Sequence, residues 1–484
     1  MIQVKEKRDG KDFRIPPIVI NKNEHVVIVG LGKSGLSAAK FCLQQGARVT
    51  VSDAARLDKL DPQRCRELER IGVFLESGGH SRELFETADL ILVSPGVPLN
   101  TKMLIEARLR NIPVVGEMSL AAHYLRTPML AVTGTNGKTT VTSLLGEIFA
   151  ACGKKVFVGG NIGTPLTDYL AGPQEMDAVI LEISSFQLDT AINLKPRVAV
   201  LLNITEDHLD RYESLQDYAL SKFSIFKNQN KTDISIINAD DDESRRYLEN
   251  TTSLRHGWEV RSVLFYGKSG TFKKGAVLRV KKVKLVLDGT SQKEEIFNLA
   301  GTRLSESPNL ENSAAAILAS AVMGCDTEGI RKGLANFNPL AHRFELVAAI
   351  GGVAYVDDSK ATNVGAVKSA LDSVQGNIVL IAGGRDKGGD YSPMAKGIAQ
   401  KVKALLLIGE AKERMAAAFH GLTKIEMVDS LEDAVFMARD MAVSGDTVLL
   451  SPACASFDMF ESYAARGHCF ADSVRKLTVL KKSL

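Results

Sequence analysis

The chain has 484 residues, of which 45% are hydrophobic and 24% are charged, and this composition excludes a disordered or fibrous protein. Lysine and arginine (60) nearly balance aspartate and glutamate (57), so the net charge of +3 gives no general attraction for nucleic acid or for an acidic membrane. The six cysteines are scattered and include no CxxC pair, which argues against a disulfide framework or a zinc site.

The N-terminal residues are charged and lack the apolar core of a secretory signal. The longest apolar stretch, residues 314–324, is too short to span a bilayer and is typical of a buried helix. We therefore expect a cytoplasmic protein, and its length suggests about three domains.

The first predicted unit follows a polar extension, residues 1–22. Strands are expected at residues 25–30, 47–53, 90–93 and 114–115, with a first helix at 34–45. Strands that alternate with helices indicate a parallel sheet covered on both faces.

The second predicted unit begins near residue 127 and the third near residue 341. The second has strands at 129–132, 178–183 and 198–204 and a helix at 141–151; the third has strands at 353–356, 378–381, 404–408 and 447–450. Residues 271–297 alternate apolar and basic side chains, which predicts a two-stranded hairpin with a solvated lysine face rather than a nucleic-acid patch. The fold class is therefore α/β with three consecutive domains, at residues 1–126, 127–340 and 341–484.

Two glycine-rich turns follow predicted strands. The first, residues 30–35, is a GxGxxG turn, and Asp53 ends the next strand, where a dinucleotide fold holds a ribose-binding acid. A tight turn without a ligand is the alternative. The second, residues 133–140, reads TGTNGKTT, in which backbone N–H groups cradle phosphates, Lys138 neutralises them and a threonine hydroxyl can bind Mg²⁺. Its sequence leaves open whether the nucleotide is ATP or GTP.

These two turns discriminate between function classes. A dehydrogenase would use the first turn and leave the second idle, whereas a ligase that binds a nucleotide-linked substrate in one domain and ATP in the next would use both.

Glu182 at the end of an apolar strand could bind Mg²⁺, because a buried carboxylate is costly unless it is paired or ligates a metal. His208 could be a ligand, a base or a hydrogen-bonding partner, and the residue pattern gives Lys222 no role.

Polar clusters follow the strands of the third unit, at residues 357–363, 382–389 and 451–458, and a further cluster occupies 342–345. They combine cations with hydroxyls, which suits recognition of carboxylate or phosphate. Cys454 stands beside Ser456, but no partner base marks it as a nucleophile.

The motifs TGTNGKTT, LEISSFQL, NITEDHLDRY, HRFE, DDSKATN and SPACASFD occur in this order, and the chain resembles the Mur ligases over residues 25–475. These are ATP-dependent amino-acid ligases of peptidoglycan synthesis. The resemblance implies a Rossmann-like N-terminal domain for the UDP-substrate, a P-loop ATPase-like central domain and a Rossmann-like C-terminal domain for the amino acid. The chain is most similar to the members that join D-glutamate to UDP-N-acetylmuramoyl-L-alanine, through an acyl phosphate.

The resemblance also implies roles for residues. It implies two Mg²⁺ ions, held by Thr139, Glu182, His208 and a carbamylated Lys222, with Lys138, His208 and Lys222 as catalytic residues. The implied ATP contacts are Gly134, Thr135, Asn136, Gly137, Lys138, Thr139, Thr140, Asn312, Arg343 and Asp358. The implied substrate contacts are Ser34, Asp53 and Gly96 for UDP, Asn161 for the muramoyl group, and Thr362, Lys387, Ser456 and Phe457 for D-glutamate. A monomer without a nucleic-acid or membrane partner is expected.

The sequence departs from the family pattern at two places. Pro308-Asn309 stands where a Gly-x-His-Asn segment often precedes Asn312, and Ala54-Ala55 replaces a Thr-Arg pair after Asp53. Three alternatives remain: another Mur-type or folylpolyglutamate-type amide ligase, an NAD(P)-dependent oxidoreductase that uses the first turn, and a nucleotide-binding regulatory protein. The oxidoreductase leaves the second turn unexplained, and the regulator leaves the third-domain clusters unexplained.

Overall fold

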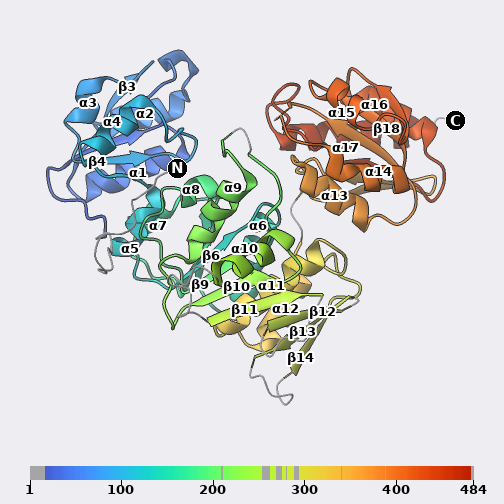
Figure 1. The fold of residues 1–484 in the computed structure, drawn as a ribbon, viewed down its shortest axis with the longest axis horizontal. Helices are drawn as coiled ribbons and strands as arrows, with labels where there is room; N and C mark the ends of the chain where they lie inside the picture. Colours follow the sequence, from blue (N-terminus) through green and yellow to red (C-terminus); the bar gives the residue numbers. More distant parts are fainter. Residues whose placement is uncertain are drawn as a thin grey trace.

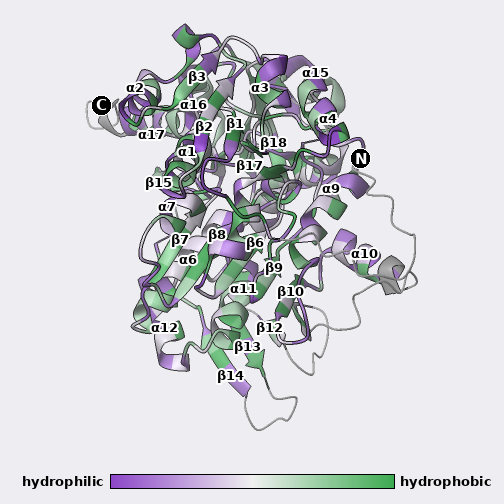
Figure 2. Cartoon of the chain, turned by 90° about the vertical axis from the view of Figure 1, so that its left-hand side faces the viewer, coloured by the Kyte–Doolittle hydropathy of each residue, from purple (hydrophilic) through white to green (hydrophobic). Residues whose placement is uncertain are grey.

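A computed structural model describes residues 17–208, 211–252, 262–268, 275–279, 281–287, 294–338, 341–386 and 388–480 of the chain. Its strands form three sheets that follow one another along the sequence, which confirms the predicted α/β architecture of three units (Figure 1). The first and third units lie over the same side of the central one in both views (Figures 1 and 2).

The first sheet is parallel, and its described strands have the order β3-β2-β1-β4-β5. All five residues of β1, HVVIV, are buried, as a central strand covered on both faces requires. The strands are β1 (His25–Val29), β2 (Arg48–Asp53), β3 (Phe74–Ser77), β4 (Leu90–Val93) and β5 (Val114–Gly116). The helices are α1 (Lys33–Gln44), α2 (Pro62–Arg70), α3 (Arg82–Glu86), α4 (Lys102–Leu109) and α5 (Ala121–Tyr124).

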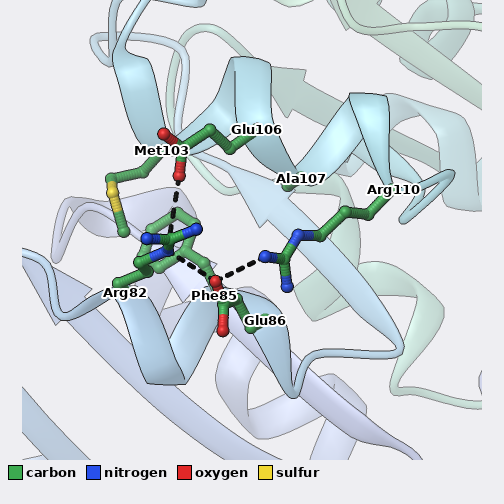
Figure 3. Close-up of a pocket in the computed structure, with 7 residues that line it drawn as sticks. All are labelled: Arg82, Phe85, Glu86, Met103, Glu106, Ala107 and Arg110. Carbon is green, nitrogen blue, oxygen red and sulfur yellow. Dashed lines mark hydrogen bonds and ion pairs between the residues drawn. The ribbon is translucent and has the colours of Figure 1, made fainter.

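A small hollow between α3 and α4 is bordered by ion pairs (Figure 3). Glu86 Oε1 lies 2.6 Å from both Arg82 Nε and Arg110 Nη2, and Glu106 Oε2 lies 3.8 Å from Arg82 Nε. The hollow encloses about 10 Å³, which is room for about one water molecule. It is therefore far too small for a substrate, and the charged side chains around it belong to the solvated surface of the first domain.

The central sheet has the order β14-β13-β12-β11-β10-β9-β6-β8-β7 among the described strands. It is parallel from β7 to β12, and β12, β13 and β14 form an antiparallel meander. Its strands are β6 (Met129–Thr133), β7 (Val156–Gly160), β8 (Ala178–Glu182), β9 (Val198–Leu201), β10 (Ile234–Asn238), β11 (Ser262–Gly267), β12 (Gly275–Arg279), β13 (Lys282–Val286) and β14 (Glu294–Asn298).

The central helices pack apolar side chains onto this sheet, where the hydrophobic residues of the domain gather (Figure 2). All residues of α11 from Asn312 to Ser320 are buried. The predicted buried helix at 314–324 is therefore confirmed except at its C-terminal end, because the burial stops at Ser320. The helices are α6 (Lys138–Ala151), α7 (Leu166–Leu170), α8 (Ser185–Leu188), α9 (Leu215–Phe223), α10 (Asp242–Thr252), α11 (Asn309–Val322) and α12 (Thr327–Asn336).

The predicted two-stranded hairpin at 271–297 is wrong, because three strands form there. The third strand, β14, has the sequence EEIFN, in which Phe297 is the only residue that is buried, so its apolar signal is weak. The lysine face is also not simply solvated: Lys284 Nζ lies 2.6 Å from Glu294 Oε1 on β14. Cross-strand ion pairs of this kind add a little to sheet stability.

The third sheet has the order β15-β16-β20-β17-β18-β19 among its described strands, and only the β15–β16 pairing is antiparallel. Its strands are β15 (Glu345–Ile350), β16 (Val353–Asp357), β17 (Ile378–Gly383), β18 (Val402–Ile408), β19 (Lys424–Met427) and β20 (Thr447–Leu450). Its helices are α13 (Val364–Ser373), α14 (Ala395–Lys401), α15 (Lys412–Ala418), α16 (Leu431–Met441) and α17 (Tyr463–Leu480). No described helix has the length and apolar character needed to cross a membrane.

The first and central domains share a buried polar interface. Glu117, which follows β5, is 6% exposed and accepts hydrogen bonds from the backbone N–H (2.8 Å) and the hydroxyl (3.0 Å) of Thr167 on α7. Gly116 N donates to the carbonyl oxygen of Thr190 at 3.0 Å, and a Cβ on Gly116 would lie 2.1 Å from Thr190 Oγ1. This contact places the carboxyl ends of the first sheet next to the central domain.

Candidate active site

The loop between β6 and α6 has the shape of a phosphate cradle. Gly137 has a φ of +85° and precedes the first residue of α6, Lys138, so the loop passes into the helix through a left-handed residue. A Cβ on Gly137 would lie 2.4 Å from Asn312 Oδ1, so the side chain of Asn312 on α11 lies directly against the loop. Two residues implied in ATP binding, far apart in sequence, are therefore neighbours in the structure.

Lys138 lies inside this loop. Its Nζ donates hydrogen bonds to the carbonyl oxygens of Gly134 (2.8 Å) and Thr135 (2.7 Å). Burial lowers the pKa of Lys138, and the carboxylates of Glu182 and Asp207 oppose that shift. A lysine held here can exchange its carbonyl partners for the oxygens of a phosphate group, which are stronger acceptors because they are ionised.

Glu182 ends β8, the strand next to β6, and carries an oxygen that lacks a partner. The residue is 2% exposed, and its Oε1 accepts a hydrogen bond of 2.7 Å from Asn161 Nδ2. Its Oε2 is buried and has no hydrogen-bond partner among the residues that the structure describes. The hydroxyl of Thr133, at the end of β6, is also buried without a partner in the described part of the chain. Because an unsatisfied buried carboxylate oxygen is costly, this position fits a hard cation such as Mg²⁺.

His208 and Lys222 lie around one aromatic ring, that of Tyr218 on α9. Lys222 is 1% exposed, its Nζ donates 2.8 Å to the carbonyl oxygen of Gly134, and it lies 4.3 Å from the centre of the Tyr218 ring. The His208 ring lies 6.3 Å from Tyr218 and 4.7 Å from Phe186. Burial, and next the charge of Lys138, hold the pKa of Lys222 well below its usual value. The direction of this shift favours the neutral amine over the ammonium form.

The sequence held a signal for Lys222 that its surroundings now explain. Tyr218, Ala219 and Phe223 form the buried face of α9, and Lys222 is four residues after Tyr218, so it must share that face. A lysine on the apolar face of an amphipathic helix is seldom fully buried unless it has a partner.

The third domain brings Arg343 and Asp358 to the same region. The residues that precede them are joined: His342 Nδ1 lies 2.7 Å from Asp357 Oδ2, and both are buried. Asp358 accepts from Phe344 N (3.2 Å) and from Ser451 Oγ (2.9 Å), and burial raises its pKa to about 7. Burial also lowers the pKa of Arg343, and the carboxylate of Glu182 in the central domain is the largest opposing influence.

The first domain presents open backbone at the carboxyl edge of its sheet. Asp53 accepts hydrogen bonds from Leu31 N (2.6 Å) and Ala55 N (2.8 Å), so its carboxylate supports the GxGxxG turn as well as facing this edge. Ser34, in that turn, is partly exposed, and a Cβ on Gly96 would meet no atom within 4 Å. The backbone at Gly96 is therefore open on the side where a Cβ would stand, whereas a Cβ on Gly30 in the turn would lie 3.0 Å from Ser94 Cβ.

The four residues implied in D-glutamate binding differ in exposure. Ser456 is 2% exposed, Thr362 is partly buried and Phe457 is 66% exposed, whereas Lys387 lies outside the described residues. The loops that carry Thr362 and Ser456 are tied together by Arg466 on α17, which sequence reasoning missed. Its Nη2 donates to the carbonyl oxygens of Ser359 (2.9 Å) and Cys454 (3.1 Å).

Three family models match successive parts of the chain: the Mur ligase MurD-like N-terminal domain at residues 24–116, the Mur ligase middle domain at 132–320, and the Mur ligase glutamate ligase domain at 342–454. Among curated relatives, a UDP-N-acetylmuramoylalanine–D-glutamate ligase of Geotalea uraniireducens is 44% identical over 94% of this chain and 98% of its own length. One with the same name from Desulfosudis oleivorans is 44% identical over 95% of this chain and 98% of its own.

Solved structures support the fold. A pseudomurein peptide ligase type C of Methanothermus fervidus has a TM-score of 0.58 at 20% identity, covering 94% of this chain and all of that one. A UDP-N-acetylmuramate–alanine ligase of Thermotoga maritima has a TM-score of 0.55 at 18% identity, covering 93% of this chain and 99% of that one. With a phosphate loop, a buried carboxylate beside it and matches to all three domain models, the chain belongs to the Mur ligase family.

Proposed function

We propose that this chain joins D-glutamate to UDP-N-acetylmuramoyl-L-alanine at the expense of ATP, a step of peptidoglycan synthesis. The observation that carries the proposal is the 44% identity, over 94% of the chain, to a relative named for this reaction. Mur ligases are ATP-dependent, and the loop from Gly134 to Thr140 supplies the backbone for binding the phosphates, with Asn312, Arg343 and Asp358 as further contacts to the nucleotide.

The proposed magnesium ligands come from the resemblance to the family, and a buried oxygen supports one of them. Thr139 and Glu182 would hold one ion, and the unpartnered Oε2 of Glu182 fits that role. His208 and Lys222 would hold a second ion. Mg²⁺ bound there supplies positive charge that offsets the negative charge of the phosphate groups.

Carbamylation of Lys222 would replace its amine, at the second site, with a group that offers two oxygen atoms. The Lys222 nitrogen attacks CO₂, an N–C bond forms, and one proton leaves for solvent, which gives a carbamate with one negative charge. The reaction requires a neutral amine, and the lowered pKa of Lys222 favours that form. Carboxylate-type oxygens are the ligands that Mg²⁺ prefers, which an ammonium group cannot provide.

The chemistry needs two anions to meet. The carboxylate of the bound L-alanyl group attacks the γ-phosphorus, ADP leaves, and an acyl phosphate results. The amine of D-glutamate then attacks the acyl carbon, and inorganic phosphate leaves after the nitrogen loses a proton. Lys138, with the loop N–H groups, would stabilise the charge that develops on the transferred phosphoryl group, and its position in the loop supports this role.

Each outer domain holds one substrate. Ser34, Asp53 and Gly96 would bind the UDP group, and Asn161, hydrogen-bonded to Glu182, would contact the muramoyl group. Thr362, Lys387, Ser456 and Phe457 would bind D-glutamate on the third domain. Joining these substrates requires the third domain to lie against the central one, and the influence of the Glu182 charge on the pKa of Arg343 supports that position.

The test is ADP release by the purified protein with UDP-N-acetylmuramoyl-L-alanine and one amino acid at a time. Turnover with D-glutamate, and none with L-lysine or meso-diaminopimelate, is expected. Lys138→Ala should abolish turnover without loss of fold, and Lys155→Ala, an exposed lysine beyond the end of the same helix, is the control. Turnover with another amino acid only, or with none, contradicts the proposal.

A further inference from the structure

The start of α13 is where the third domain contacts the phosphate loop. Asn363, 8% exposed, precedes this helix, and its Nδ2 donates hydrogen bonds to Asn136 Oδ1 (3.1 Å) in the phosphate loop and to Asp207 Oδ2 (3.1 Å) after β9. Its Oδ1 accepts a hydrogen bond of 2.8 Å from Ala366 N and so caps α13. One side chain thus joins a helix of the third domain to two loops of the central domain.

The orientation of the Asn363 amide follows from these partners. Ala366 N is a donor, so the atom that faces it must be the amide oxygen, and the NH₂ group then faces Asn136 and Asp207. Asp207 presents a carboxylate oxygen, which strengthens the hydrogen bond from Asn363.

Gly365 shows that the approach of α13 is close. A Cβ there would lie 2.5 Å from Oγ1, 3.0 Å from Cβ and 3.2 Å from Cγ2 of Thr205, so rotation of the threonine side chain would not relieve the contact. Gly365 lies within α13 and does not have a positive φ, so its backbone conformation does not require glycine. The space beside Thr205 is what requires it.

We propose that Asn363 is a positioning residue that couples closure of the third domain to the phosphate loop. In the closed arrangement its NH₂ group fixes Asn136, two residues before Lys138, and Asp207, the neighbour of His208. When the third domain moves away, both residues lose this donor. The inference rests on the proposed function, because the third domain must carry D-glutamate to the acyl phosphate for closure to matter.

Two substitutions separate this role from the helix cap. Asn363→Asp keeps the oxygen that caps α13 but places a carboxylate oxygen, in place of a donor, beside Asp207. Asn363→Ser also keeps a capping oxygen and is too short to reach Asn136 and Asp207. We expect kcat/KM for D-glutamate to fall by about tenfold or more in Asn363→Asp and by less in Asn363→Ser. Both variants lose the two hydrogen bonds, but only Asn363→Asp adds a charge repulsion.

Gly365→Ala provides an independent route to the same opening. Alanine favours the helix over glycine, so α13 itself should not be weakened, yet the added methyl group pushes it from Thr205. This variant keeps the inference testable if Asn363→Asp fails to fold. Lys368→Ala, an exposed residue on the same helix, is the matched control and should behave as the wild type.

Small-angle X-ray scattering of the full chain, with and without a non-hydrolysable ATP analogue, reports closure without turnover. We expect a larger radius of gyration for Asn363→Asp and Gly365→Ala than for the wild type with the analogue, and a melting temperature close to that of the wild type. Wild-type scattering and wild-type kcat/KM in both variants would overturn the inference. If the wild type shows no D-glutamate-dependent ADP release, the proposed function fails, and the scattering alone then decides whether Asn363 controls closure.

Discussion

Lys138 and Lys222 donate hydrogen bonds to the same oxygen, the backbone carbonyl of Gly134, each at 2.8 Å. Two ammonium groups on one carbonyl, one buried and one partly buried, repel each other in a medium that screens charge poorly. The repulsion adds to burial in lowering the pKa of Lys222, which favours its neutral amine form. A reactive amine beside a phosphate loop is the basis of the first prediction.

Lys222→Ala is expected to be inactive and to recover partly with a small carboxylate such as acetate, which can occupy the space of the carbamate and supply its oxygens. The wild type should lose activity in CO₂-free buffer and regain it with bicarbonate. Carbon-13 NMR of protein incubated with labelled bicarbonate should show a carbamate resonance that the variant lacks. Full activity of Lys222→Ala without added carboxylate would refute the role of this residue.

Gly137→Ala is expected to remove ATP-dependent activity. Two effects combine: a non-glycine residue at a φ of +85° costs about 1–2 kcal/mol, and the new Cβ would lie 2.4 Å from Asn312 Oδ1. Gly301→Ala separates the two, because its φ is +79° and a Cβ there meets no atom within 4 Å. Equal ATP affinity in both variants, measured by titration calorimetry, would show that the contact with Asn312 does not matter.

Asp358→Asn is expected to raise the stability of the third domain above pH 7. The folded-state pKa of Asp358 is about 7, above its usual value of 3.8, so the unfolded chain ionises first. Wild-type stability from this group is therefore complete below pH 4 and is lost as the pH rises to 7. Asparagine avoids that loss and can still accept from Phe344 N, while the Ser451 hydroxyl can accept from its NH₂ group.

The expected gain at pH 8 is of the order of 2 kcal/mol, since the full shift must be discounted for partial exposure of the side chain. Urea unfolding of both proteins from pH 4 to pH 8 checks this prediction, and the difference should shrink towards pH 4. Parallel curves for the two proteins over this range would contradict it. We also expect a higher KM for ATP, because Asp358 is proposed to contact the nucleotide.

The sequence predicted many of the strongly apolar strands, but it missed others, among them β3, β7, β10 and β19. The strands expected at 90–93 and 447–450 have these bounds in the structure. Helix starts were less accurate: the helix expected at 141 begins at Lys138, because the backbone turns at Gly137 and the first helical residues are polar. Helix-start signals rely on a capping side chain, and a glycine in that place gives none.

The phosphate loop was predictable because its glycines and Lys138 are close together in the sequence and form a local turn. It was less predictable where distant segments meet. Asn363 lies in the polar cluster that the sequence marked, and Arg466 does not, but their partners Asn136 and Ser359 are 227 and 107 residues away in the chain. Asp53 is similar: its position at the end of β2 was predicted, but the hydrogen bonds that it accepts from Leu31 N and Ala55 N required the coordinates.

Arg466→Lys is expected to destabilise the third domain and to weaken D-glutamate binding. Arg466 is 1% exposed, and its guanidinium also donates to the Ser359 hydroxyl (3.0 Å). Lysine keeps the charge but cannot make these bonds in several directions at once, so the loss should be about 2–4 kcal/mol. The KM for D-glutamate should rise, since the loops of Thr362 and Ser456 lose their common support.

Arg475→Lys, on the exposed face of the same helix, is the control and should stay within about 0.5 kcal/mol of the wild type. Urea unfolding and steady-state kinetics of both variants check the prediction, and wild-type values for Arg466→Lys in both would contradict it.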